Sequence, residues 1–188
     1  VCLLATEEEG ESPLGPPDGP PTLLVFGRHD SYFAKGQDIL VRLWPRVTAA
    51  LPDARLMFVG GGLKLAELRN LAAGSPAHEN INVKGFVEEQ DILPIWQQAS
   101  ALALISSLEG FGLVIAEAMR HGRPVLASLQ DAGREVNTDG VTGYNVDRND
   151  DGAIVAKVVA LLGDTEKARR MGAAGRMRWR THFRPSSF

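Results

Sequence analysis

Residues 101–119 constrain the fold most, because they join an apolar strand to an apolar helix through a glycine turn. Residues 101–105 are an uninterrupted apolar run, which is typical of a buried strand. Gly110 and Gly112 let the backbone approach a ligand beyond the end of that strand. The helix that follows begins with free N–H groups, and its dipole favours an anion there. The sequence therefore predicts a phosphate-binding site at this turn.

Two glutamates flank the predicted phosphate site. Glu109 precedes the helix, and Glu117 lies in its second turn with its side chain directed back toward the helix N-terminus. Both carboxylates can reach the same crevice, which suits a ligand with hydroxyls as well as phosphate, such as a nucleotide sugar. Alternatively, Glu109 serves only the helix dipole and Glu117 is a solvated helix position. The apolar neighbours of Glu117, at 114–116 and 118–119, favour the binding role.

With glutamates eight positions apart, the chain resembles the retaining GT-B glycosyltransferases of family 4, whose signature is E-x7-E. The resemblance extends from residue 22 to residue 188. Its other motifs are Gly27-Arg28, Lys35-Gly36, Val59 to Gly62, Val83 to Phe86, Gly122 to Val125, and Asp139-Gly140 with Gly143. It implies the C-terminal, nucleotide-sugar-binding half of such an enzyme.

Arg28 ends a predicted strand and Lys35 precedes the next helix, so both can face the same anion as the helix after Glu109. The resemblance implies that they hold the donor diphosphate, and that Arg28, Lys35 and Glu109 form the catalytic set. The alternative is a pair of surface cations. The full predicted donor-binding set is Arg28, Lys35, Gly61, Phe86, Val87, Glu109, Gly110, Phe111, Gly112, Leu113 and Glu117.

The turn at Phe86 and Val87 has two interpretations. The resemblance implies that it runs beside the nucleobase. The alternative is a connecting loop whose Phe86 side chain belongs to the core. The glycines at 60–62 favour a turn bordering the donor cleft, because Leu65 stands where a dinucleotide fingerprint needs its third glycine.

Strands and helices are predicted to alternate along the chain, which indicates a doubly wound, Rossmann-like α/β domain with a parallel sheet. The predicted strands are 22–26, 54–59, 81–85, 101–105 and 124–127, followed by a short apolar run at 144–146. The predicted helices follow Gly36 and Gly112, and span about 63–73, 91–99, 151–162 and 165–180. Residues 131–135 are expected to form a loop.

Composition excludes several classes of protein. The net charge of −3 argues against general nucleic-acid binding, and no apolar stretch approaches the ~20 residues of a membrane span. The four histidines lack metal-ligand spacing and no Asp-x-Asp pair is present, so we expect neither a metal nor another cofactor. We expect a cytoplasmic location. The basic segment 164–188 is either a solvated helix face or a surface for membrane-peripheral binding near a lipid-linked acceptor.

The acidic, proline-rich residues 1–21 are predicted to be an extended linker, and residues 22–188 a donor-binding domain. The resemblance implies retaining transfer of a sugar from an NDP-sugar to an acceptor hydroxyl. It also implies a missing N-terminal acceptor domain, so we expect the chain alone to be inactive. Two alternatives stay open: a GT-B-like sugar-nucleotide epimerase and a non-catalytic nucleotide-binding module.

Overall fold

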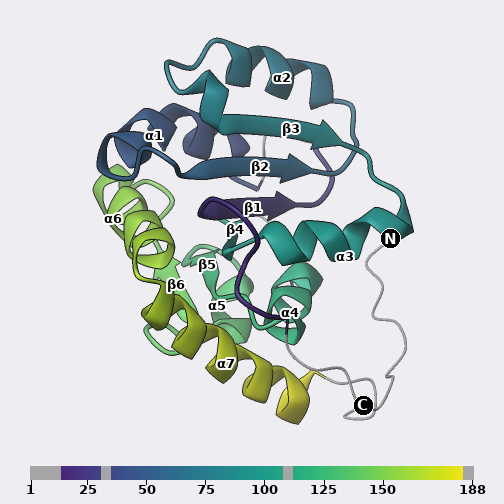
Figure 1. Ribbon diagram of the computed structural model, residues 1–188, viewed down its shortest axis with the longest axis vertical. Helices are drawn as coiled ribbons and strands as arrows, with labels where there is room; N and C mark the ends of the chain where they lie inside the picture. Colours follow the sequence, from purple (N-terminus) through teal and green to yellow (C-terminus); the bar gives the residue numbers. More distant parts are fainter. Residues whose placement is uncertain (1–13, 31–34, 108–111, 184–188) are drawn as a thin grey trace.

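The fold is built on a six-stranded parallel sheet. The structure, a computed structural model, describes residues 14–30, 35–107 and 112–183. The strands are β1 (Thr22–Phe26), β2 (Arg55–Val59), β3 (Ile81–Gly85), β4 (Ala101–Leu104), β5 (Val125–Ser128) and β6 (Gly143–Val146). They lie in the order β3-β2-β1-β4-β5-β6 (Figure 1). The predicted parallel, doubly wound sheet is confirmed.

Helices alternate with the strands as predicted. They are α1 (Gln37–Ala50), α2 (Leu65–Ala73), the 3-10 turn η1 (His78–Asn80), α3 (Glu89–Gln98), α4 (Leu113–Arg120), α5 (Gly133–Val136), α6 (Asp151–Gly163) and α7 (Thr165–His182). The bounds differ from the prediction by a few residues. Helix α5 falls where a loop was expected, and its start is stabilised by the Asp131 carboxylate, which accepts from the Gly133 N–H at 2.8 Å.

Both faces of the central strands β2, β1, β4 and β5 are buried, which explains why these strands read as apolar runs. The edge strand β3 alternates instead, with Asn82 and Lys84 exposed. Leu23 and Val25 of β1 point to the face that packs with α1, α2 and α6. Leu24, between them, points to the face that packs with α3, α4 and α7. Successive side chains of a strand alternate in this way because its side-chain period is two. Figure 1 shows the two helical layers on either side of the sheet.

The strand order reverses between β1 and β4, which are neighbours in the sheet. After β1 the chain continues toward β2, whereas after β4 it continues toward β5. The connections therefore leave in opposite directions and open a crevice beyond the carboxyl ends of these two strands. This topology places the predicted phosphate-binding turn, which follows β4, at the crevice.

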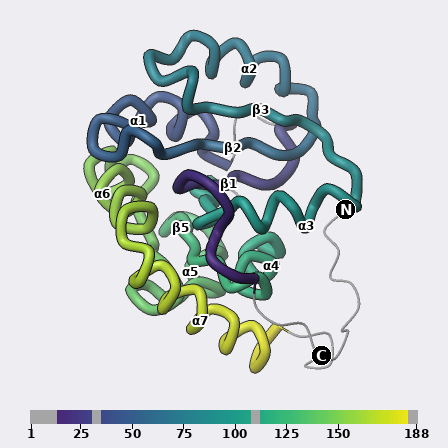
Figure 2. The backbone as a smooth tube through the Cα atoms, in the orientation of Figure 1, coloured from purple at the N-terminus to yellow at the C-terminus, as the bar shows by residue number. Residues whose placement is uncertain are grey.

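Residues 14–21 lie along the C-terminal end of α3 (Figure 2). The Arg123 guanidinium, only 5% exposed, donates to three backbone carbonyls: Trp96 O at 3.1 Å, Gln97 O at 3.4 Å and Gly15 O at 3.1 Å. The Asp18 N–H also donates to Gln97 O, at 3.1 Å. Burial lowers the pKa of Arg123, opposed by the negative charge of Asp18. The sequence indicated a linker here and gave no sign of this anchor.

We expect Arg123→Met to lower the free energy of unfolding by about 2 kcal/mol, since it leaves buried carbonyls without donors. It should also expose the segment around Leu14, which packs against the core on the α3 side of the sheet. Chemical denaturation measures the first effect and limited thermolysin cleavage at Leu14 the second. Arg170→Met, at an exposed position of α7, is the control. Equal protection of Leu14 in both variants would contradict the anchoring role.

Candidate functional site

The loops after β1 and β2 lie in direct contact at one end of the crevice. The His29 N–H donates to Gly61 O at 2.9 Å, and the Gly60 N–H donates to Gly85 O at 2.7 Å. Gly60 has φ of 128°, and a Cβ there would lie 2.0 Å from Gly27 O. No other residue fits such an approach, so the glycine run serves backbone packing around the crevice.

Gly36 brings the loop after β1 against the end of β4. Its φ is 78°, in the left-handed region, and a Cβ at Gly36 would lie 2.7 Å from Ile105 O. The side chain of Lys35 runs over Gly27, because a Cβ on that glycine would lie 2.9 Å from Lys35 Cε. Lys35 is thereby placed between the carboxyl ends of β1 and β4, where the sequence predicted a cation.

A buried pair, His29 and Gln37, holds the backbone at Lys35 through hydrogen bonds. The Lys35 N–H donates to Gln37 Oε1 at 3.1 Å, so the amide group of Gln37 faces His29 with its nitrogen. Gln37 Nε2 then donates to His29 Nδ1 at 3.0 Å, which leaves the imidazole proton on Nε2. His29 is 1% exposed, and burial lowers its pKa to about 4. No sequence motif pointed to either residue. His29 directly follows Arg28, and Gln37 lies two residues after Lys35.

Arg28 is exposed at the rim of the site and forms an ion pair with Asp30. Hydrogen bonds from the Arg28 guanidinium and from the Leu63 N–H lower the pKa of the Asp30 carboxyl. A phosphate that binds Arg28 would share or displace this carboxylate. Asp30 therefore orients the Arg28 guanidinium through this ion pair. No sequence motif pointed to Asp30.

Helix α4 begins at the crevice as predicted. Gly112, its N-cap, has φ of 76°, and the Ile115 N–H donates to Gly112 O at 2.7 Å to close the first turn. The N–H groups at the start of a helix are available to an anion. Four residues after Leu113, Glu117 is half-buried and its Oε1 accepts from Trp96 Nε1 at 3.1 Å. Glu117 is therefore not a fully solvated helix position, and its role in binding stays a prediction.

Asp131 connects the loops after β4 and β5. Its carboxylate accepts from the hydroxyl of Ser106, which is completely buried directly after β4. The other carboxylate oxygen accepts from the Gly133 N–H that starts α5. This contact ties α5 to the strand end that carries the predicted phosphate turn, and no sequence motif pointed to it.

The remaining predicted residues divide into two groups. Glu109, Gly110 and Phe111 lie outside the described residues, so their roles stay predictions. Phe86 is 72% exposed and borders Gly61, whose Cβ would lie 3.7 Å from Phe86 Cβ. The interpretation that puts Phe86 in the core is therefore wrong, and its exposed ring stands beside the glycine turn at the end of β2.

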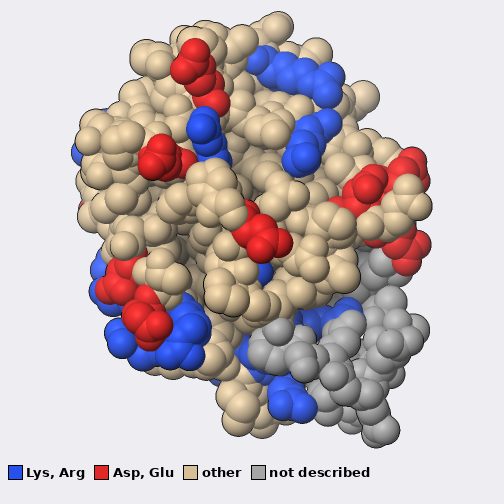
Figure 3. Space-filling model, in the orientation of Figure 1, with Lys and Arg blue, Asp and Glu red and all other residues tan. Residues whose placement is uncertain are grey.

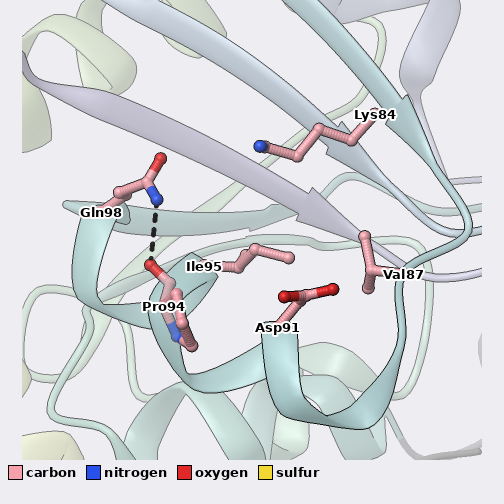
Figure 4. Close-up of a pocket in the computed structure, with 6 residues that line it drawn as sticks. All are labelled: Lys84, Val87, Asp91, Pro94, Ile95 and Gln98. Carbon is pink, nitrogen blue, oxygen red and sulfur yellow. Dashed lines mark hydrogen bonds between the residues drawn. The ribbon is translucent and has the colours of Figure 1, made fainter.

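A pocket of about 330 Å³ lies between β3 and α3 (Figure 4). It is lined by Lys84, Val87, Asp91, Pro94, Ile95 and Gln98. Only Val87 belongs to the predicted donor-binding set. Lys84 comes from β3 and the other side chains from the turn and from α3, so this pocket lies beside the strand ends and not over the start of α4.

The basic helix α7 uses part of its charge for packing. Arg176 donates to Arg120 O in α4, and Arg178 Nε donates to Val136 O at 2.8 Å. Figure 3 shows basic side chains gathered where α6 and α7 lie and acidic ones where α3 begins. In the described part of the chain, no helix is both long and apolar enough to cross a membrane. The same residues contain no group of three His, Cys, Asp or Glu side chains placed to hold a metal ion.

Comparison with known proteins assigns the family. The family described as "Glycosyl transferases group 1" matches residues 6–178. This chain belongs to the group 1 glycosyltransferase family. A GDP-mannose-dependent monoacylated alpha-(1-6)-phosphatidylinositol monomannoside mannosyltransferase from Corynebacterium glutamicum is 35% identical over 149 residues, which cover 76% of this chain and 38% of that protein. The chain spans about two fifths of the length of the curated relatives it matches.

Solved glycosyltransferase structures share the fold. The C-terminal domain of a glycosyl transferase group 1 family protein from Francisella tularensis superposes with a TM-score of 0.77 at 22% identity, covering 89% of this chain and 88% of that one. An Anabaena protein solved with UDP and glucose superposes with a TM-score of 0.74 at 23% identity, covering 88% of this chain and 45% of that one. The sheet is therefore that of a GT-B glycosyltransferase domain.

Proposed function

We propose that this group 1 glycosyltransferase chain is a C-terminal donor-binding domain of the family 4, retaining type. It binds an NDP-sugar whose glycosyl group passes to an acceptor hydroxyl. The observation that supports the proposal is that Lys35 lies after β1 and that α4, which carries Glu117, lies after β4, the two neighbouring strands where the strand order reverses. A cation, free helix N–H groups and a carboxylate at one crevice suit a ligand with both phosphates and hydroxyls.

Each group has a distinct task in this proposal. Lys35 and Arg28 neutralise the diphosphate and stabilise the charge that develops on it as the sugar leaves. The N–H groups at Gly112 and Leu113 bind phosphate and sugar, together with Gly110 and Phe111. Glu109 orients sugar hydroxyls and Glu117 accepts from the ribose. No metal ion takes part, so binding should persist in EDTA.

The relatives suggest candidate donors, and titration has to choose between their bases and sugars. The Corynebacterium relative is named for GDP-mannose, and the Anabaena structure holds UDP. We place the base beside Phe86, Val87 and Gly61, because the exposed ring of Phe86 borders the glycine turn there. An acceptor attached to a lipid, as in the name of the Corynebacterium relative, is compatible with this half of the enzyme.

We expect Lys35→Ala to weaken binding of the preferred nucleoside diphosphate about tenfold and to leave binding of the bare nucleoside unchanged. The physical reason is that the proposed contact of the Lys35 ammonium is with the diphosphate and not with the nucleoside. Calorimetric titration with GDP, UDP, ADP and TDP identifies the nucleoside diphosphate that the parent chain prefers. Lys35→Ala and a control variant are then titrated with that nucleoside diphosphate and with its nucleoside. Lys84→Ala, an exposed lysine of β3 at the edge of the lateral pocket, is the matched control.

The proposal fails if the chain binds none of the four nucleoside diphosphates. Equal weakening of nucleoside and diphosphate by Lys35→Ala would instead indicate that the lysine is structural. A loss that shrinks in high salt agrees with a partly exposed cation.

A further inference from the structure

Trp96 contacts Glu117 through the indole N–H, and this contact joins two elements that the sequence separates by 21 residues. Trp96 lies on α3 and is completely buried. Its Nε1 donates to Glu117 Oε1 on α4 at 3.1 Å. The described structure thus gives the carboxylate that the proposed function assigns to the ribose a fixed donor inside the protein.

Two aromatic rings pack against the indole ring of Trp96. The ring of His121, the residue that follows α4, stacks on it with centroids 5.1 Å apart and planes inclined by 28°. The ring of Phe26, at the carboxyl end of β1, lies 6.0 Å away at 58°. The carbonyl of Trp96 also accepts from Arg123 Nε. With ring and backbone both held, the N–H of Trp96 can point in only one direction.

A carboxylate held in this way is prepared for a ligand. A glutamate side chain has three rotatable bonds, and ordering them on binding costs conformational entropy. An ionised carboxylate has about four lone-pair positions on its two oxygens, so it can accept from more than one donor at a time. The order of the site is therefore already present before the nucleotide arrives.

We propose that Trp96 is a positioning residue that orients Glu117 toward the ribose hydroxyls of the donor. The inference rests on the proposed function, because it assumes that Glu117 faces a ribose. It differs from a packing role in one respect: it requires the N–H as well as the ring. Trp96 touches no ligand in this proposal and acts only through the carboxylate.

The test compares two tryptophan substitutions. Trp96→Phe keeps an aromatic ring between Phe26 and His121 but removes the donor. Trp44→Phe is the matched control, because Trp44 is also completely buried, packs on the opposite face of the sheet, and has an indole nitrogen without a hydrogen-bond partner. Each variant is titrated with the ribonucleoside diphosphate that binds the parent most tightly, and with the 2′,3′-dideoxy form of that nucleotide.

We expect the preference for the ribose form over the dideoxy form to fall about tenfold in Trp96→Phe and to stay unchanged in Trp44→Phe. Glu117→Ala should lower the same preference, and combining it with Trp96→Phe should add nothing further. An unchanged preference in a folded Trp96→Phe variant overturns the proposal, whatever happens to overall affinity. A parent that binds none of GDP, UDP, ADP and TDP refutes the proposed function itself.

A second measurement needs no substitution at the site. In the unaltered chain, the ¹H–¹⁵N signal of the Trp96 indole should shift when the nucleoside diphosphate binds. It is distinguished from the signals of Trp44 and Trp179 by Trp44→Phe and Trp179→Phe. The dideoxy form should shift it much less, because it lacks the hydroxyls that compete for the carboxylate. A signal that ignores both ligands at saturation overturns the proposal even where Trp96→Phe fails to fold.

Discussion

The 188-residue chain is expected to bind a nucleoside diphosphate and to transfer no sugar, with a rate at least ~10⁵-fold below that of an intact relative. We propose that the acceptor site and the second wall of the crevice belong to an N-terminal domain. Without them, neither orientation of the acceptor nor exclusion of water from the donor is available. The chain covers 38% of its Corynebacterium relative and 88% of a C-terminal domain from Francisella, which supports this division.

The measurement is transfer from radiolabelled GDP-mannose and UDP-glucose to the relative's acceptor. Three samples are compared: the chain alone, the intact Corynebacterium enzyme, and a chimera that carries the N-terminal half of that enzyme before this chain. We expect transfer from the second and third samples only. Transfer by the chain alone within tenfold of the intact enzyme would contradict the two-domain requirement. Conversion of either donor without any acceptor would instead favour the epimerase alternative.

The second large effect concerns pH and stability. The pKa of His29 is lowered from 6.5 to about 4, chiefly by burial. The charge of Asp30 raises this pKa and that of Lys35 lowers it, both by smaller amounts. The unfolded chain therefore binds more protons than the folded chain between these values. Stability contributed by neutral His29 is complete above about pH 6.5 and is lost as pH falls toward 4. The expected loss by pH 4 is about 3 kcal/mol, since one pKa unit is about 1.4 kcal/mol and a 1% exposed ring is little screened.

His29→Asn is the informative variant, because an amide can still accept from Gln37 but cannot titrate. Urea denaturation between pH 7 and pH 4 should show a falling free energy of unfolding for the parent and a flatter profile for the variant. The carboxylates whose pKa is lowered, at Asp30, Asp147, Asp151 and Glu166, affect a lower range, below about pH 4.5. Parallel profiles for parent and variant would refute the assignment.

The His29 protonation has a functional consequence at the same loop. A proton on Nδ1 would face the Gln37 amide nitrogen, and turning that amide would break its bond to the Lys35 N–H. The hydrogen bond from the Lys35 N–H to Gln37 is therefore expected to form only while His29 is neutral. This agrees with a donor site that is complete at neutral pH.

Several features could be predicted because they depend on neighbours in the sequence. The apolar run at 101–105 predicted a buried strand, and Gly112 with the apolar residues after it predicted the start of α4. Alternation of strands and helices then left a doubly wound parallel sheet as the consistent architecture. Lys35 and Glu117 were found because each follows a strand end at a recognisable spacing, and parallel strands end at one edge of the sheet.

Other features depended on contacts that spacing does not encode. The strand order sets β1 beside β4, and only that neighbourhood places Gly36 against Ile105. Helix α5 depends on the Asp131 contact to the Gly133 N–H, which a loop sequence does not reveal. Arg123 carries no signal in the sequence either, because its partners are backbone carbonyls, and every residue has one.

The sequence by itself determined the class of fold, the family resemblance and the positions of the cation and the carboxylate, because periodicity and local turn chemistry are written along the chain. Only the tertiary structure decided how those groups are held. Trp96 meets Glu117, and Gln37 joins His29 to Lys35, across helices and loops whose packing no single segment specifies. The direction of a side chain is set by the neighbours that fill the space around it, and those neighbours exist only once the chain has folded.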